Sequence, residues 1–175
     1  LEKIKPYQQK RTSCASCVAH CVGTFKVPDG PFACVGEGPE YEAEYSMGSS
    51  LGNSSIESLI KLDNMCDLLG LDSISTGITI SWAVECFEKG ILTKEDTGGI
   101  ELKWGDPKTY AELIGMIAKR EGFGDLLAEG SRKASQIIGR GSIYYAMQTK
   151  GLEHPGHSTR ATHGMGLGYA VNTRG

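Results

Sequence analysis

Residues 56–77 read IESLIKLDNMCDLLGLDSISTG, and this stretch decides the fold. The apolar residues that recur in it every three or four positions are Ile56, Leu59, Leu62, Cys66 and Leu69. This spacing places them on one face of an amphipathic helix. Asn53 or Ser54 can cap that helix, Gly70 can stop it, and Asp72 or Ser73 can open the next one at once. The stretch therefore predicts two helices joined at a tight glycine corner.

Helical patterns continue along the rest of the chain. The second helix has apolar residues on two faces, which indicates that it is largely buried. These residues are Ile78, Trp82 and Cys86 on one face and Ile80, Val84 and Phe87 on the other. Asp106 and Pro107 begin a third helix, with an apolar stripe at Tyr110, Leu113, Ile114 and Ile117. The inward residues expected in a fourth helix are Leu127, Gly130, Ala134, Ile137 and Ile138.

Alternating strand patterns are scarce in the sequence. We therefore predict the all-α class: a multi-helix domain with irregular glycine-rich connections. No composition shift or repeat marks an internal boundary, so residues 1–175 are expected to form a single helical domain, a partial one.

The composition limits the classes of protein to which this chain can belong. With 175 residues, of which 39% are hydrophobic and 22% charged, the chain is typical of a soluble globular domain. Its net charge of −3 argues against a nucleic-acid partner. It has no run of about 18 apolar residues, so no membrane span is expected. Residues 1–6 hold neither an initiator methionine nor an apolar signal core, which indicates an interior piece of a longer protein.

Three cysteines form the motif C-A-S-C-V-A-H-C at Cys14, Cys17 and Cys21. Thiols at this spacing can turn toward one point, and we interpret them as three ligands of an iron–sulfur cluster, which needs a fourth thiolate. Three other interpretations stay open. A zinc site usually adds a distant second pair of thiols, which is absent here. A thioredoxin-like dithiol would follow a strand, and no strand pattern precedes residues 11–13. The third interpretation is that these are buried cysteines that lie close together by coincidence.

The remaining cysteines, Cys34, Cys66 and Cys86, stand singly. Cys66 and Cys86 fall inside helical patterns, where a free cysteine behaves as a small hydrophobe. The uneven spacing argues against a disulfide framework. A reducing compartment, the cytoplasm, is therefore expected.

The corner at residues 66–77 is the second candidate site. The end of one helix and the start of the next expose backbone N–H groups beside two carboxylates, Asp67 and Asp72. Such a place binds polar ring edges and phosphates. The alternative is an ordinary corner in which Asp72 only caps the second helix.

The segment from Gly164 to Tyr169 can also form a helix. Its three glycines cost roughly 1 kcal/mol each relative to alanine. We therefore expect its backbone to approach another group closely.

Together these motifs resemble those of the aldehyde:ferredoxin oxidoreductases, tungsten enzymes that hold the metal between two pterin dithiolenes beside a [4Fe-4S] cluster. Cys14-x-x-Cys17-x-x-x-Cys21 is similar to the three clustered cysteines of that family, and Asp67-x-x-Gly70-Leu71-Asp72 to its Asp-x-x-Gly-Leu-Cys/Asp motif. Residues 38–42 resemble the stretch that brings an acidic residue to the tungsten, and residues 164–175 resemble a further signature. The likeness runs from about Cys14 to the last residue.

The resemblance implies roles for individual residues. The implied cluster ligands are Cys14, Cys17 and Cys21, and the implied pterin contacts are Asp67, Gly70, Leu71 and Asp72. Glu42 would be the catalytic carboxylate near the metal, with Glu40 as the alternative, because the length of the preceding loop leaves the register open. A solvated charge cluster of Glu37, Glu40, Glu42 and Glu44 would explain these residues without such a role.

Two departures from the family pattern bear on function. Where the family has Tyr-Asp-Pro-Arg, this chain has His-Ser-Thr-Arg at residues 157–160. Histidine titrates near neutrality, which makes His157 a candidate catalytic proton donor, although a lone histidine is more often structural. Asn64 and Lys61 stand where some members bind a bridging metal between subunits. A homodimer would therefore form without bridging iron.

For the intact protein the resemblance implies a tungsten or molybdenum bispterin and a [4Fe-4S] cluster, and it allows a magnesium ion that bridges the pterin phosphates. The implied reaction is oxidation of a small aldehyde to a carboxylic acid, with electrons passed to ferredoxin. The fourth cluster cysteine, a further histidine and a β domain would lie outside these residues, so the piece alone is expected to be inactive. The alternatives are the catalytic subunit of a tungsten-dependent aromatic acyl-CoA reductase, and a helical electron-transfer or interaction module without tungsten.

Overall fold

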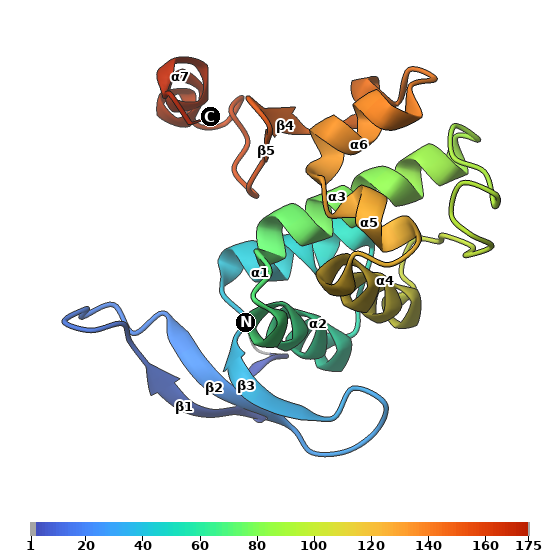
Figure 1. Cartoon of the computed structure of the whole chain (residues 1–175). Coiled ribbons are helices and arrows are strands. Elements are labelled where there is room, and N and C mark those ends of the chain that lie inside the picture. Colours follow the sequence, from blue (N-terminus) through green and yellow to red (C-terminus); the bar gives the residue numbers. More distant parts are fainter. Residues whose placement is uncertain (1–2, 175) are drawn as a thin grey trace.

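Seven α-helices and five short strands form in residues 3–174, the part of the chain that this computed structural model describes (Figure 1). The helices are α1 (Tyr41–Ser46), α2 (Ile56–Leu69), α3 (Ser73–Glu88), α4 (Pro107–Lys119), α5 (Phe123–Leu127), α6 (Gly130–Ile138) and α7 (His163–Val171). The strands are β1 (Gln8–Thr12), β2 (Val22–Val27), β3 (Cys34–Gly38), β4 (Gln148–Thr149) and β5 (Leu152–Glu153). Single 3-10 turns are η1 (Lys5–Tyr7), η2 (Ser49–Leu51) and η3 (Ser142–Tyr145).

Helices α2 and α3 meet at the predicted glycine corner. The Ser55 hydroxyl caps α2 by accepting an N–H of its first turn, one or two residues beyond the predicted caps Asn53 and Ser54. Asn53 instead accepts the Ser55 N–H. Gly70 ends α2 at a φ of 69°, a left-handed conformation that glycine adopts without steric penalty.

Helix α3 lies at the centre of the main core. Both of its predicted apolar faces are buried, with Trp82 at 2% and Ile80 at 0% exposed. The core joins it to α2, α4, α5 and α6 through Leu62, Leu113, Leu127 and Ala134. Burial of each large side chain contributes roughly 1.5–3 kcal/mol. Two residues predicted on apolar helix faces are exposed. Ile137 is 65% exposed, because α6 faces the core through Ala134 and Ile138, and Leu69 is 42% exposed in the last turn of α2.

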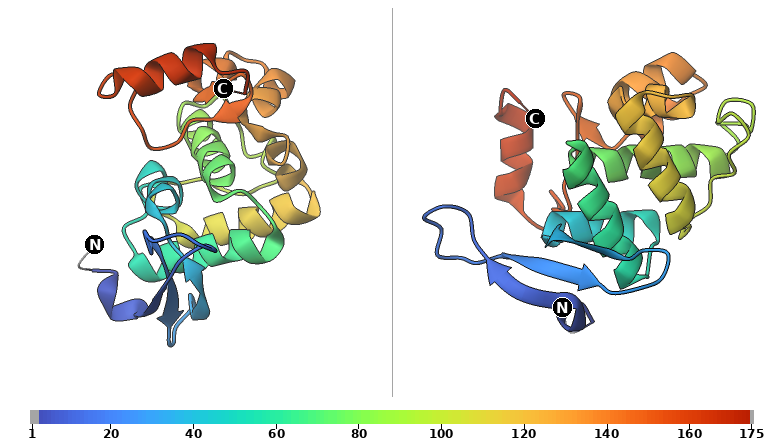
Figure 2. Two further views of the ribbon diagram at one scale, coloured as in Figure 1. Left: turned by 90° about the vertical axis from the view of Figure 1, so that its left-hand side faces the viewer. Right: turned by 60° about the horizontal axis from the view of Figure 1, so that its bottom comes forward.

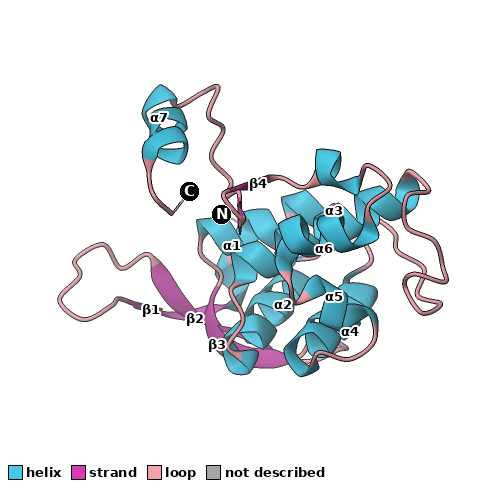
Figure 3. Cartoon of the chain, turned by 45° about the horizontal axis from the view of Figure 1, so that its top comes forward, coloured by secondary structure: helices cyan, strands magenta, loops and turns pink. Residues whose placement is uncertain are grey.

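An antiparallel sheet in the order β1-β2-β3 covers one face of α2 (Figure 3). Phe25 and Val27 of β2 pack with Ile4 and with Ile60 of α2 in a second, smaller core. A short ribbon of β4 and β5 lies near the other end of the chain. The sheet and α7 lie on different sides of the helical core in both views of Figure 2.

The prediction of an all-α fold is therefore correct only for most of the chain, since 48% is helical and 12% is strand. Strand β1 was not predicted, because its sequence, Gln-Gln-Lys-Arg-Thr, has no alternation of apolar and polar residues. It forms an exposed edge of the sheet. In β3, Gly36 and Gly38 interrupt the pattern. β1 also ends just before the cysteine motif, which contradicts the expectation that no strand precedes it. The cysteines follow in a loop and not at a helix start.

Helix α7 forms over the predicted C-terminal segment. A Cβ at Gly166 would lie 3.5 Å from Thr159, and positions 164 and 168 are open. The close backbone approach that we expected is thus limited to Thr159 within residues 3–174. None of the helices in this part of the chain has the length and apolar composition that a membrane crossing needs.

Gly77 of α3 lets α1 lie directly on α3. A Cβ at Gly77 would lie 2.5 Å from the Ser46 carbonyl oxygen and 2.7 Å from its carbon. Because these are backbone atoms, Gly77→Ala must displace α1. We expect overpacking to cost about 1–3 kcal/mol, which exceeds the roughly 1 kcal/mol that alanine gains over glycine in a helix.

Gly115→Ala in α4 is the matched control, because a Cβ there meets nothing within 4 Å. It is expected to raise the free energy of unfolding by about 0.5–1 kcal/mol. Urea unfolding followed by circular dichroism measures both variants. Equal stabilisation by the two substitutions would show that α1 and α3 are not in this close contact.

Candidate functional site

The glycine corner has the geometry of a capped helix pair. The Gly70 N–H donates to the carbonyls of Cys66 and Asp67, and the carboxylate of Asp72 accepts the N–H groups of Ile74 and Ser75. Asp72 thus has the capping role that the alternative interpretation gave it. Contacts of Asp67, Gly70, Leu71 and Asp72 with a pterin remain a prediction. Only Asp67, Gly70 and Asp72 are exposed for such contacts, since Leu71 packs partly against the main core.

A cavity of about 310 Å³ opens beside this corner. It lies between the end of β3, the start of α1 and the last two turns of α2. Five carboxylates line it, and no lysine or arginine of residues 3–174 does so; they are Glu37, Glu40, Glu42, Asp63 and Asp67. The structure therefore brings two separately predicted residues, Glu42 and Asp67, to one acidic cavity.

Asp63 is the member of this cavity that sequence reasoning missed. It lies four residues before Asp67, so both carboxylates face the same side of α2. Only 5% of Asp63 is exposed. Burial, followed by the negative charges of Asp67 and Glu40, raises the pKa of Asp63 from 3.8 to about 7. Burial and then Glu37 also raise the pKa of Asp67.

Two glycines of β3 let its backbone approach α2 at this point. Gly38 has a φ of 120°, and a Cβ there would overlap the Asp63 carboxylate. A Cβ at Gly36 would overlap the Asn64 amide. Asn64 is consequently buried under β3, with 5% of the residue exposed. This packing fixes Asp63 in the wall of the cavity.

Glu42 and His157, the two predicted catalytic residues, are in direct contact. His157 Nδ1 lies 2.7 Å from Glu42 Oε1, and the Gly156 N–H donates to Glu42 Oε2 at 2.7 Å. The Tyr41 hydroxyl donates to the Gly156 carbonyl at 2.9 Å, and its ring meets that of His157 edge-on. Glu40 lines the acidic cavity but makes no side-chain cap on α1. Both carboxylate oxygens of Glu42 therefore contact the same short segment, at Gly156 and His157, which is distant in the sequence.

Glu153 anchors the segment that carries His157. It is buried, with 7% exposed, and its Oε1 accepts both the N–H and the hydroxyl of Ser131 at 2.8 Å. The Thr79 hydroxyl lies 3.4 Å from the same oxygen. Strand β5 is thereby fixed to α3 and α6 only four residues before His157. A single buried carboxylate in a two-residue strand gave no pattern from which this role could be predicted.

The three clustered cysteines lie in the loop between β1 and β2, which extends beyond the sheet (Figure 1). Cys14, Cys17 and Cys21 are exposed and free. The Cys17 N–H donates to the Cys14 carbonyl at 3.1 Å, and the Ala19 N–H lies 3.5 Å from the Cys17 sulfur. The loop does not gather the three sulfurs around one point, and residues 3–174 contain no group of three His, Cys, Asp or Glu side chains arranged to hold a metal ion.

Two of the other cysteines, Cys66 and Cys86, are buried in the core. Burial raises the pKa of both Cys66 and Cys86 to about 12, so they stay as neutral thiols in the core, as predicted. Every cysteine in the described part of the chain is free. Three accessible thiols within eight residues are the donor set that an iron–sulfur cluster uses.

Comparisons with known proteins agree with this picture. The family model described as "Aldehyde ferredoxin oxidoreductase, domains 2 & 3" matches residues 1–175. The chain is 42% identical over 160 residues to the tungsten-containing aldehyde ferredoxin oxidoreductase of Pyrococcus furiosus, covering 91% of this chain and 26% of that protein. It is 37% identical over 166 residues, with the same coverage, to the WOR-like subunit of aliphatic sulfonate oxidoreductase from that organism.

A solved structure is also similar. The active site complex of benzoyl coenzyme A reductase, with bound 1,5-dienoyl-CoA, superposes with a TM-score of 0.74 at 26% identity, over 87% of this chain and 22% of that one. The chain thus spans about a quarter of the length of the curated relatives, 26% in each case.

The buried acid in the cavity predicts a pH dependence of stability. Folded Asp63 keeps its proton up to about pH 7, whereas the unfolded chain releases it near pH 3.8. Stability should therefore fall as the pH rises through this window, by on the order of 4 kcal/mol at most. Asp63→Asn should flatten this fall and exceed the parent in stability at pH 8.

Urea unfolding at pH 4, 5.5, 7 and 8 measures the effect. Asp29→Asn, at an exposed position, is the control and should keep the slope of the parent chain. An unchanged slope in Asp63→Asn would show that Asp63 ionises freely in the folded state.

Proposed function

The chain belongs to the aldehyde ferredoxin oxidoreductase family, and from this premise we propose that it forms part of an enzyme that oxidises aldehydes to carboxylic acids. The enzyme would hold tungsten between two pterins beside a [4Fe-4S] cluster and pass electrons to ferredoxin. Because the chain spans 26% of its relatives' length, this activity is proposed for the intact protein.

The contact between Glu42 and His157 carries the proposal. Oxidation of an aldehyde to an acid consumes one water and releases two protons and two electrons, so the site needs groups that accept protons. Glu42 Oε1 and His157 Nδ1, 2.7 Å apart, can hold a proton between them and pass it outward. The Gly156 N–H fixes the other oxygen of Glu42, which keeps the carboxylate in place.

The residues present suit the implied cofactors. Cys14, Cys17 and Cys21 would hold the cluster once the exposed loop closes around it. Asp67 would bind a pterin edge, since a pterin ring carries N–H donors that match the carboxylates of the acidic cavity. Asp72 would contribute its backbone, because its carboxylate already caps α3. When bound, the metal and the cluster would supply two-electron chemistry and one-electron transfer respectively.

Asn64 bears on the proposed subunit arrangement. It is buried under β3 beside Gly36, away from the surface of this chain. This supports a homodimer, where one forms, without bridging iron. Molybdenum in place of tungsten, and magnesium on the pterin phosphates, are compatible with the same residues.

A second candidate function is reduction of an aromatic acyl-CoA. The structural match to benzoyl coenzyme A reductase favours it, together with the histidine at position 157. In that direction the His157–Glu42 pair would donate a proton instead of accepting one. The two functions differ in the direction of electron flow.

Glu42→Gln and His157→Gln test the proton role. In the intact protein with an aldehyde and an artificial acceptor, we expect kcat to fall about 10²- to 10⁴-fold in each variant. The double variant should be no slower than the slower single one, because the two residues act as a unit.

Glu44→Gln, which removes the same charge from the same helix, is the control and should keep the parent rate. Turnover of an aromatic acyl-CoA with a strong reductant, and none of aldehydes, would favour the second function. Full activity in both single variants would remove the pair from the mechanism.

Metal content tests the cofactors. The intact protein should contain about one tungsten and four iron atoms per chain. Cys14→Ser should lower iron, whereas Cys34→Ser, outside the clustered loop, should not. Iron without tungsten would instead support the electron-transfer module.

A further inference from the structure

The part of the sheet that carries the three clustered cysteines is positively charged. Residues 3–28 contain five lysine or arginine residues and no aspartate or glutamate, whereas the whole chain has a net charge of −3. Three of these cations lie in strands and are exposed: Lys10 and Arg11 in β1, and Lys26 in β2. None of the three takes part in an ion pair formed within residues 3–174. We call these three residues the basic patch.

The strand register places the basic patch beside the loop of residues 13–21, which we call the cysteine loop. Lys10 pairs with Thr24, and Lys26 follows Thr24 by two residues, so both lysines lie on the outward face of the sheet. Arg11 pairs with Gly23, one residue nearer to the loop. The cysteine loop extends from this end of the sheet (Figure 1). The cations therefore lie next to the thiols.

The acids near the sheet lie on its far strand or near the start of β1. Glu37 of β3 pairs with Thr24 on the side opposite to Lys10, and it lines the acidic cavity. Asp29 and Glu57 lie near Tyr7, where the chain enters β1, and both raise the pKa of that tyrosine after its hydrogen bond to Glu57 and its burial. The positive charge is therefore concentrated on the two strands that flank the cysteine loop.

An apolar side chain lies inside the cysteine loop. Val18 follows Cys17 directly and is 93% exposed. Protein interfaces combine such apolar contacts with a charged rim. The free edge of β1 carries Lys10 and Arg11, and charged edge residues oppose the addition of another strand. This surface therefore suits side-chain contacts with a folded protein and not strand pairing with a second copy of the chain.

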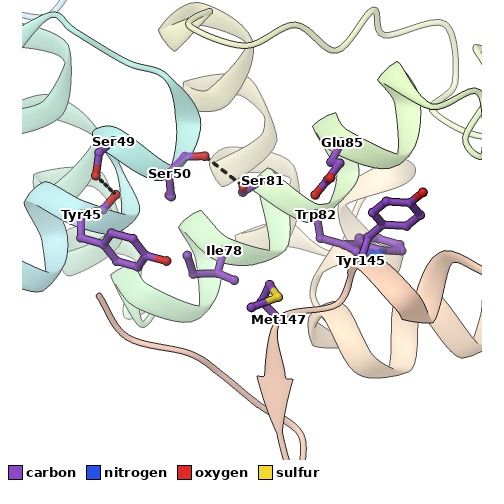
Figure 4. Close-up of a pocket in the computed structure, with 9 residues that line it drawn as sticks. All are labelled: Tyr45, Ser49, Ser50, Ile78, Ser81, Trp82, Glu85, Tyr145 and Met147. Carbon is purple, nitrogen blue, oxygen red and sulfur yellow. Dashed lines mark hydrogen bonds between the residues drawn. The ribbon is translucent and has the colours of Figure 1, made fainter. Parts of the chain in front are cut away.

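The concave sites of the chain lie elsewhere in the fold. The pocket in Figure 4 is bounded by α1, η2, α3 and the segment after η3, and its lining includes no residue of the sheet or of the cysteine loop. The acidic cavity takes only Val22, Glu37 and Gly38 from the sheet. Small ligands bind in concave pockets, whereas the basic patch lies on strand surface beside an extended loop. The charge therefore suits a macromolecular partner of opposite sign.

The overall charge decides which macromolecule fits. A nucleic acid carries negative charge along its whole length, which the net charge of −3 opposes beyond the patch. A compact protein with a local acidic face meets only the three cations and Val18. Such small, charge-steered contacts are typical of transient electron-transfer complexes.

We propose that the basic patch and Val18 dock an electron-carrier protein through an acidic face of that carrier. The contact brings the carrier beside Cys14, Cys17 and Cys21. At each encounter the carrier gains one electron and the centre held by these thiols loses one, so two encounters remove the two electrons of one aldehyde oxidation. The proposal rests on the proposed function for the identity of that centre. It adds the surface and the charge by which the partner is recognised.

Binding is measured first, between the intact protein and an immobilised two-cluster ferredoxin whose surface is rich in acidic residues. At an ionic strength of about 0.1 M, changing Lys10→Glu and Arg11→Glu together should lower the association rate constant about tenfold or more, because rim charges act mainly on this rate. At about 1 M, where the Debye length is about 3 Å, the difference from the parent should disappear. Lys26→Glu, on the other strand, should act in the same direction.

The matched control changes Lys108→Glu and Lys119→Glu together. Both lysines are exposed on α4, which packs on α2, α3 and α5, and the pair alters the net charge by the same amount. The control should keep the association rate of the parent. An equal loss in the control would show that the net charge, and not the basic patch, steers the carrier. Unchanged association in both the β1 double variant and Lys26→Glu overturns the proposal.

Two further probes test the kind of partner. Cytochrome c, a cationic electron carrier, should bind the parent at least about tenfold more weakly than the ferredoxin, because like charges then face each other. A short DNA duplex should also bind more weakly than the ferredoxin at about 0.15 M salt. Tighter binding of either probe than of the ferredoxin overturns the assignment to an acidic carrier.

Turnover separates this proposal from the function on which it rests. With ferredoxin as the acceptor, the β1 double variant should raise KM for ferredoxin about tenfold, whereas KM for the aldehyde should not rise. An equal rise of both KM values overturns docking at the basic patch and leaves aldehyde oxidation intact. If no aldehyde is oxidised, the proposed function fails, and the association rates still decide whether the patch binds the carrier.

Discussion

The contact of Gly77 with the backbone of Ser46 determines where both cavities lie. Because glycine has no side chain, α1 comes within van der Waals distance of α3, which is itself buried on both faces. The start of α1 then places Glu42 in the wall of the acidic cavity, and its end places Tyr45 in the wall of a neighbouring cavity that His157 and Arg160 also line. One helix of six residues thus lines two cavities, and its position depends on a single missing Cβ.

The second half of the site depends on a different interaction. The segment after β5 has little apolar surface of its own, and the buried carboxylate of Glu153 holds it to α6 and α3. A buried carboxylate is stable only when its oxygens are hydrogen-bonded, and Ser131 supplies two such bonds. This fixes Gly156 and His157 against Glu42, which lies 114 residues earlier than Gly156. The site therefore joins two segments that both pack on α3 and are far apart in the sequence.

Much of this arrangement could be predicted from local pattern. The helices around Gly70 and Asp106 carry their apolar stripes in the sequence, and both formed, although Ser55 caps α2 in place of the predicted Asn53 or Ser54. Strand β1 could not be predicted, because an exposed edge strand has no apolar alternation to reveal it. Glu42 and His157 were each identified through resemblance, but their contact depends on tertiary packing. Asp63 was missed for the same reason: only the close approach of Gly38 makes it a buried acid.

Glu42 lies at a boundary between two regions of unlike charge. On one side are the carboxylates of the acidic cavity, and on the other His154, His157 and Arg160 line the neighbouring cavity. Under the proposed oxidation, a neutral aldehyde would meet no electrostatic barrier in either region, whereas the carboxylate formed from it would be repelled by each nearby acid, by about 1 kcal/mol at 4 Å in water and more near protein. The same asymmetry would favour movement of that product toward Arg160. Under the same proposal, an imidazole at position 157 differs from a phenol because it can carry a positive charge, and the carboxylate of Glu42 lies 2.7 Å away to offset that charge.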